Sequence, residues 1–100
     1  MKCFDIHVHI FPDKIAARTV EMLGSHAKIA PTYDGSRAGL VASMERAGLA
    51  GALNCPIATK KEQVVSINEW AAAQNRWPVL SLGTIHPDTP EPAAVLASLK

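Results

Sequence analysis

The sequence has 100 residues, of which 48% are hydrophobic and 19% are charged, and its formal net charge at pH 7 is +1. This length suits one small domain or part of a larger one, and so weak a charge gives no electrostatic reason to expect binding to nucleic acid or to an anionic membrane. No run approaches the roughly 20 apolar residues of a membrane span, so we expect a cytoplasmic protein. Cys3 and Cys55 lie in separate apolar runs, which is typical of buried free thiols.

The first predicted strand spans residues 3–10 and has the sequence CFDIHVHI. Its β-branched and aromatic residues favour a strand, and alternate side chains of a strand point to opposite faces. The expected apolar face consists of Phe4, Ile6, Val8 and Ile10, and the expected polar face consists of Cys3, Asp5, His7 and His9. The polar face therefore carries groups that bind protons or metal ions.

Helices and strands are predicted to alternate along the rest of the chain. Helices are expected over residues 12–24, with Gly24 as the stop, then over 36–48 and 60–75, and a last helix is expected to be capped by Thr89 with Pro90 just inside it. Further strands are expected over residues 50–56 and 79–85. This alternation predicts an α/β fold with three neighbouring parallel strands in the order 1-2-3, and helices on one side only.

Three strands cannot close a barrel, and the last helical pattern is still unfinished at Lys100. We therefore expect the chain to be the first part of a larger α/β protein. The open third strand would leave an apolar edge that invites association.

His7 and His9 are the candidate metal ligands. At about 3.3 Å per residue, their Cα atoms would lie roughly 6–7 Å apart, with both side chains on one face. They would also lie at the carboxyl end of the strand, where parallel α/β folds place their chemistry. Two imidazoles there can converge on one divalent ion. The alternative is a pair of solvated or hydrogen-bonded histidines.

Other polar residues near the expected strand ends have open roles. Asp5 would either hydrogen-bond a metal-binding imidazole or satisfy backbone donors. His86, after the third strand, would either contact substrate or stabilise its own turn. Asn54, near the end of the second strand, is expected to hydrogen-bond inside the fold.

The stretch DIHVHIFP, followed by LNCPIAT and SLGTIHPD, resembles the start of an amidohydrolase-superfamily protein. The branch that it resembles contains aminocarboxymuconate-semialdehyde decarboxylase and metal-dependent hydrolases. The resemblance extends over the whole chain but covers only about the first third of that family's barrel. It implies the N-terminal portion of an eight-stranded (β/α) TIM barrel with one or two divalent ions at its mouth.

The resemblance assigns His7 and His9 to the family's first two metal ligands, with Zn²⁺ as the first choice of ion and Mn²⁺ as the second. The other ligands, including the aspartate that activates water, would lie beyond Lys100. The implied activity of the intact protein is metal-dependent hydrolysis of a C–N or C–O bond in a small-molecule substrate, or alternatively non-oxidative decarboxylation. The intact protein is also a candidate homo-oligomer. The 100-residue chain alone is expected to be inactive.

Two other classes remain as alternatives. Phosphoesterases of the polymerase-and-histidinol-phosphatase type also begin with His-x-His, but they continue with a Thr and a Ser-Asp-Gly-like stretch where this chain has Ile10, Phe11 and Pro12. A non-enzymatic metal-binding or interaction fragment is the second alternative. The unclosed sheet argues against a self-sufficient module of that kind.

Overall fold

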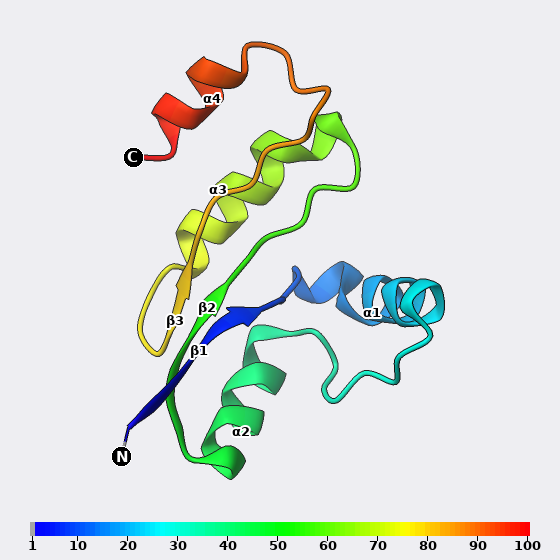
Figure 1. The fold of residues 1–100 in the computed structure, drawn as a ribbon, viewed down its shortest axis with the longest axis vertical. Helices are drawn as coiled ribbons and strands as arrows, with labels where there is room; N and C mark the ends of the chain where they lie inside the picture. The colour runs from blue at the N-terminus through cyan, green and yellow to red at the C-terminus, as the bar shows by residue number, and fades with distance from the viewer. Residues whose placement is uncertain (1) are drawn as a thin grey trace.

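The computed structural model describes residues 2–100 and shows an open parallel sheet with helices (Figure 1). The strands are β1 (Cys3–Val8), β2 (Leu49–Asn54) and β3 (Val79–Ser81), and they are hydrogen-bonded in the order β1-β2-β3. Both pairings are parallel. The predicted α/β class, strand order and strand direction are therefore confirmed, although each strand is shorter than the sequence suggested.

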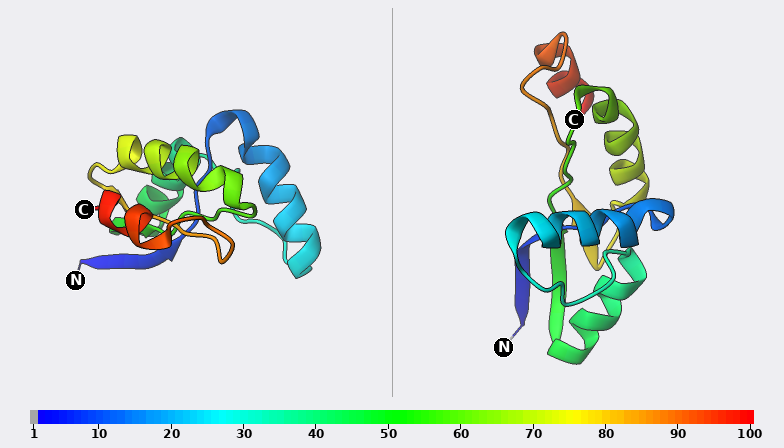
Figure 2. Two further views of the ribbon diagram at one scale, coloured as in Figure 1. Left: turned by 90° about the horizontal axis from the view of Figure 1, so that it is seen from above. Right: turned by 90° about the vertical axis from the view of Figure 1, so that its right-hand side faces the viewer.

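Not every helix lies over the sheet, but those that do lie on the same face. They are α1 (Asp13–Ala27), α2 (Arg37–Ala47), α3 (Val64–Gln74, after a 3-10 turn at Lys61–Gln63) and α4 (Pro92–Ser98). Figure 2 shows α2 and α3 on the same side of the sheet, as predicted, with α1 running across the strand direction beside the end of β1. Helix α4 lies beyond the carboxyl end of β3 in the same views. Within residues 2–100, no helix covers the opposite face of the sheet.

Local signals explain where α2 begins and ends. Ser36 is its N-cap and accepts a hydrogen bond from Gly39 N at 2.9 Å, which satisfies a backbone donor of the first turn. Gly48 ends the helix with a φ of 71°, a left-handed conformation that glycine adopts without steric cost. The predicted helix over residues 36–48 is therefore confirmed.

The predicted end of α1 at Gly24 was wrong, because the helix continues to Ala27 and is closed by Lys28 in a left-handed conformation. Gly24 instead permits a close backbone approach: a Cβ there would lie 3.0 Å from the Ile29 carbonyl oxygen. That approach accompanies a hydrogen bond from Ile29 N to Gly24 O at 3.1 Å. The segment after α1 is thereby folded back onto the helix.

The predicted cap of the last helix was also wrong. Glu91 is the N-cap of α4 and Pro92 occupies its first turn. Thr89 is buried, and its hydroxyl accepts a hydrogen bond from His86 N at 3.0 Å. Its oxygen therefore closes the turn before the helix and does not cap the helix itself.

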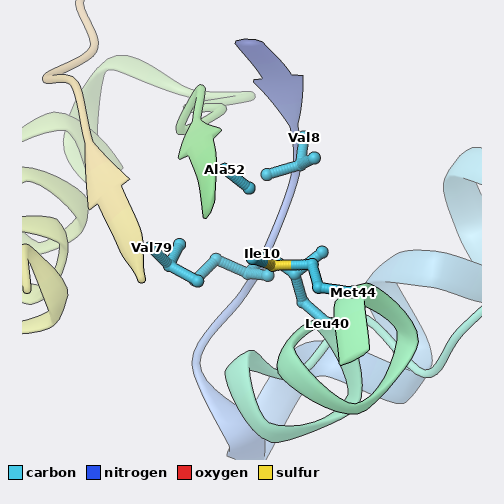
Figure 3. Close-up of a cluster of buried hydrophobic side chains, with 6 residues drawn as sticks. All are labelled: Val8, Ile10, Leu40, Met44, Ala52 and Val79. Atoms are coloured by element: carbon cyan, nitrogen blue, oxygen red, sulfur yellow. The ribbon is translucent and has the colours of Figure 1, made fainter. Parts of the chain in front are cut away.

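The core lies between the sheet and α2. Figure 3 shows its six buried apolar side chains, which come from β1 and the residues just after it, from α2, from β2 and from β3: Val8, Ile10, Leu40, Met44, Ala52 and Val79. Ala52 and Val79 are directly paired across β2 and β3, and neither is accessible to solvent. This cluster fixes the side of the sheet that faces the helices.

Strand β1 does not keep the strict alternation that the sequence suggested. Its register against β2 shifts between Asp5 and Val8. As a result Ile6, expected among the buried apolar residues, is 72% exposed, whereas Val8 is buried. Phe4 is 40% exposed and stacks on Trp77 at a centroid distance of 6.3 Å. The exposure of Ile6 accompanies the extra residue that β1 accommodates between Asp5 and Val8.

The helix-free face is unusually apolar for a surface in contact with water. In addition to Ile6 and Phe4, Leu80, which alternates with buried Val79, is 37% exposed. The accessible area is 6774 Å², against about 5500 Å² for a compact protein of this mass. The radius of gyration is 14.0 Å, against about 13 Å for a compact chain of this length. The fold is therefore open.

Both cysteines are free, as predicted, but their burial was overestimated. Cys3, at the start of edge strand β1, is exposed, and Cys55 is half-buried.

The loop before α2 contains a carboxylate whose titration affects folding. Asp34 Oδ1 accepts hydrogen bonds from the Ser36 hydroxyl at 2.7 Å and from Ser36 N at 2.9 Å. The hydroxyl bond, followed by the backbone bond, lowers the pKa of the Asp34 carboxyl below its ordinary value. A lowered folded-state pKa stabilises the fold above the unfolded-state pKa, and this contribution is lost as the pH falls through the folded-state pKa.

We therefore expect the charge-dependent part of the stability difference between the wild type and Asp34→Asn to disappear on acidification. Asparagine keeps an acceptor for Ser36 but does not titrate. Urea unfolding at a series of pH values should show a constant difference above about pH 5 and a shrinking one below about pH 4. A difference that stays constant down to about pH 2 would contradict this assignment.

Candidate functional site

His7 lies near the carboxyl end of β1, and His9 lies just after the strand. Val8 and Ile10, which alternate with them, belong to the core in contact with α2 (Figure 3). Regular alternation would put both rings on the side without helices, but β1 is irregular between Asp5 and Val8, and His9 also lines a hollow beside α1. Their ring centroids are 5.0 Å apart, with the planes at 77°. The predicted placement of both histidines on the helix-free face stays a prediction.

The imidazole of His9 is held by the chain that follows β2. His9 Nδ1 lies 2.7 Å from the carbonyl oxygen of Cys55. A carbonyl can only accept, so Nδ1 carries the proton and donates it. In the neutral ring the lone pair is then on Nε2. Metal-binding histidines are commonly oriented in this way, with the other ring nitrogen donating to a backbone carbonyl.

The backbone around His9 is also fixed. Cys55 N donates to Val8 O at 2.8 Å, and the Tyr33 hydroxyl donates to His9 O. Burial raises the pKa of Tyr33, so its hydroxyl keeps its proton and remains a donor. His9 is thus held through both its ring and its backbone.

His7 is exposed, and its ring has fewer restraints than that of His9. Its backbone N–H donates to Asp5 Oδ1 at 3.0 Å. The Asp5 carboxylate therefore bonds a backbone donor, which is one of the two roles that the sequence left open. The register pairs Asp5 with Ala52, a core residue on the helix-covered side. Asp5 thus supports the strand end through the backbone of His7.

The separation of the two ring centroids is compatible with two ligands of one ion. An imidazole nitrogen binds zinc at about 2.0–2.1 Å, which puts the centroids of two rings on one tetrahedral ion roughly 5 Å apart. The observed separation of 5.0 Å agrees with this value. Among residues 2–100, however, no group of three or more His, Cys, Asp or Glu side chains is placed to hold an ion. Two histidines are fewer than the three or four protein ligands of an ordinary zinc site.

His86 is engaged in its own turn. Its Nδ1 accepts a hydrogen bond from Asp88 N at 3.1 Å and lies 3.9 Å from Asp88 Oδ2. A nitrogen that accepts an N–H cannot at the same time donate to a carboxylate, and the shorter contact describes the neutral ring better. The contacts of His86 are those of a turn-stabilising residue, the second of the two roles proposed for it.

Asn54 lies beneath the site and is inaccessible to solvent. Its Oδ1 accepts from Ile10 N at 3.0 Å, and its Nδ2 donates to Ser81 Oγ at 3.2 Å. The expected hydrogen bonding of Asn54 inside the fold is confirmed. Through these bonds Asn54 joins the segment after β1 to β3.

Sequence reasoning missed the contributions of Tyr33 and the Cys55 carbonyl to the site. Tyr33 lies 24 residues from His9 in the sequence, and Cys55 lies 46 residues away. A backbone carbonyl has no sequence signature, and Tyr33 was hidden in a stretch that reads only as a loop. The Pro31 and Gly35 breakers around it indicate the loop but not its contact with the strand end.

Within residues 2–100, no helix is both long enough and apolar enough to cross a membrane. No family model, curated protein or solved structure matches the chain.

Proposed function

We propose that the chain is the His-x-His portion of a metal-dependent hydrolase of the amidohydrolase type, which acts on a C–N or C–O bond of a small molecule. One observation carries the proposal: His7 and His9 lie side by side at the carboxyl end of the first parallel strand, with rings 5.0 Å apart and Nδ1 of His9 donating to a backbone carbonyl. This arrangement leaves Nε2 of a neutral His9 free for an ion.

The residues of this chain have distinct parts in the proposed site. His7 and His9 would hold a divalent ion, zinc first and manganese second, and the Cys55 carbonyl would keep the His9 ring in the orientation that binding needs. When bound, such an ion supplies a Lewis acid that polarises a carbonyl and lowers the pKa of water to about 7. The remaining ligands and the base would come from elsewhere in the intact protein, so residues 2–100 alone would have no turnover.

Zinc binding is the direct test. We expect calorimetry with ZnCl₂ to show weak, saturable binding to the wild-type chain, because two imidazoles are fewer than the three or four protein ligands of ordinary zinc sites. The double variant His7→Ala/His9→Ala should lose this binding entirely.

The matched control is His26→Ala, which removes an exposed histidine of α1 whose Nδ1 bonds Met22 O at 3.0 Å. Zinc uptake by this variant should equal that of the wild type. Unchanged uptake by the double variant, or an equal loss in the control, would show that His7 and His9 are not the metal ligands.

A further inference from the structure

A hollow lies between α1 and the segment that follows it, and His9 is at its rim. Its volume is about 340 Å³, and its lining includes His9, Phe11, Val20, Leu23, Ala27 and Tyr33. We call it the α1 hollow. Figure 2 shows the segment after α1 running back beneath the helix towards α2. The volume is within the range of about 300–1,000 Å³ that small-molecule sites occupy.

The frame of the α1 hollow is fixed at both ends of the returning segment. At one end, Ile29 N donates to Gly24 O at 3.1 Å. At the other end, the Tyr33 hydroxyl donates to His9 O, and Phe11 N donates to Gly35 O at 2.8 Å. The walls are thus joined by hydrogen bonds to α1 and to the chain just after β1, so the hollow is formed before any ligand binds.

Gly35 is essential to this frame. Its φ is 81°, and a Cβ there would collide with Val20 and lie 3.3 Å from the Phe11 ring. Only glycine both adopts this conformation readily and leaves room for the segment to approach α1 so closely. The position of Tyr33 beside His9 therefore depends on the residue type at position 35.

The chemistry of the lining selects an uncharged ligand. No Asp, Glu, Lys or Arg of residues 2–100 lines the α1 hollow. The Tyr33 hydroxyl is already used in its bond to His9 O. Burying a charged group without a partner is costly, whereas apolar surface gains free energy when it leaves water. A second hollow beside the same segment is lined by Glu21, Lys28 and Asp34 and does not include His9. It therefore has neither an uncharged lining nor a histidine of the candidate site.

We propose that the α1 hollow binds an uncharged apolar group of the substrate, an aromatic ring or a branched alkyl chain, and places the adjoining bond at His9. The reaction at that bond rests on the proposed function, whereas binding of the apolar group to the hollow does not. The substrate class is therefore a neutral amide or ester with an apolar substituent next to the bond that is cleaved.

The probe for this proposal is benzamide, with acetamide as the matched compound that lacks the ring. Ligand-observed NMR should show saturable binding of benzamide in the millimolar range and none of acetamide. Ala27→Phe should fill the hollow and weaken benzamide binding at least tenfold. Ala73→Phe makes the same change at an exposed position of α3 outside the hollow, and it should leave binding unchanged.

Ala27 is exposed and is the last residue of α1, so its replacement should leave the fold intact, which circular dichroism will check. Ala30→Phe fills the hollow from the opposite wall and gives an independent measurement. The absence of saturable benzamide binding, or binding that neither filling variant weakens, would overturn the proposal.

Manganese separates this inference from the proposed function. Mn²⁺ bound at His7 and His9 should broaden the ring signals of bound benzamide, and the broadening should vanish in His7→Ala/His9→Ala. If Mn²⁺ binds at the histidines without broadening them, the ligand does not lie beside His9 and the proposal fails. If Mn²⁺ does not bind but the filling variants still weaken benzamide binding, the hollow is supported and only the metal site is wrong.

Discussion

Asn54→Leu is expected to destabilise the protein by about 3 kcal/mol, because it leaves buried partners of the Asn54 amide without hydrogen bonds. Leucine has the same branched arrangement of non-hydrogen atoms as asparagine, although its methyl groups are larger, and it can neither accept from Ile10 N nor donate to Ser81 Oγ. An unsatisfied buried polar group costs about 1–3 kcal/mol, and the position has no access to water. Since small domains are stable by about 5–15 kcal/mol, the loss is a large fraction of the total.

The measurement is the midpoint of urea unfolding, compared with that of Asn75→Leu. Asn75 is exposed and accepts a single hydrogen bond, from Ser81 N at 3.1 Å, so the same chemical change there should cost no more than about 1 kcal/mol. Equal losses in the two variants would mean that Asn54 does not hold the segment after β1 in the way described.

Leu40→Ala is expected to lower the free energy of unfolding by about 3 kcal/mol, since it creates a cavity in the core between the sheet and α2. Leu40 is 4% exposed and packs with Val8 and Met44. For a chain of this size the midpoint of thermal unfolding should fall by roughly 10–20 °C.

Leu96→Ala is the matched control, because it makes the same substitution in α4 at a side chain that is 55% exposed. Its effect should stay below about 1 kcal/mol, as little apolar area returns to water. If the two substitutions cost the same, the core does not lie between α2 and the sheet.

The elements that the sequence predicted well are those with local signals at both ends. Helix α2 has a serine N-cap and a glycine in the left-handed conformation directly after it, and it begins and ends where these residues indicate. The start of α4 was missed because two prolines compete. Pro90 and Pro92 both suit a first turn, and the choice depends on the hydrogen bond between Thr89 and His86 N, which sequence periodicity does not reveal.

In the candidate site, too, the sequence predicted the features that have a local signal and missed those that depend on tertiary contacts. The alternate spacing of His7 and His9 was sufficient to place both residues near one strand end, because the pattern of alternating apolar residues marks the strand. The protonated nitrogen of His9 is determined by a carbonyl 46 residues away, and the register shift of β1 depends on its pairing with β2. Both are consequences of tertiary structure, so no local pattern could have predicted them.

The apolar side chains on the helix-free face also determine how stability varies with temperature. Unfolding raises the heat capacity because it hydrates apolar surface that was dry, by about 1.2–1.5 kcal/mol/K for 100 residues. Ile6 is already largely hydrated in the folded state and Leu80 partly so, and they therefore add little to this increase. The stability curve of residues 2–100 is therefore flatter than that of a closed domain of equal length, and a partner that covers this face would bind with a negative heat-capacity change.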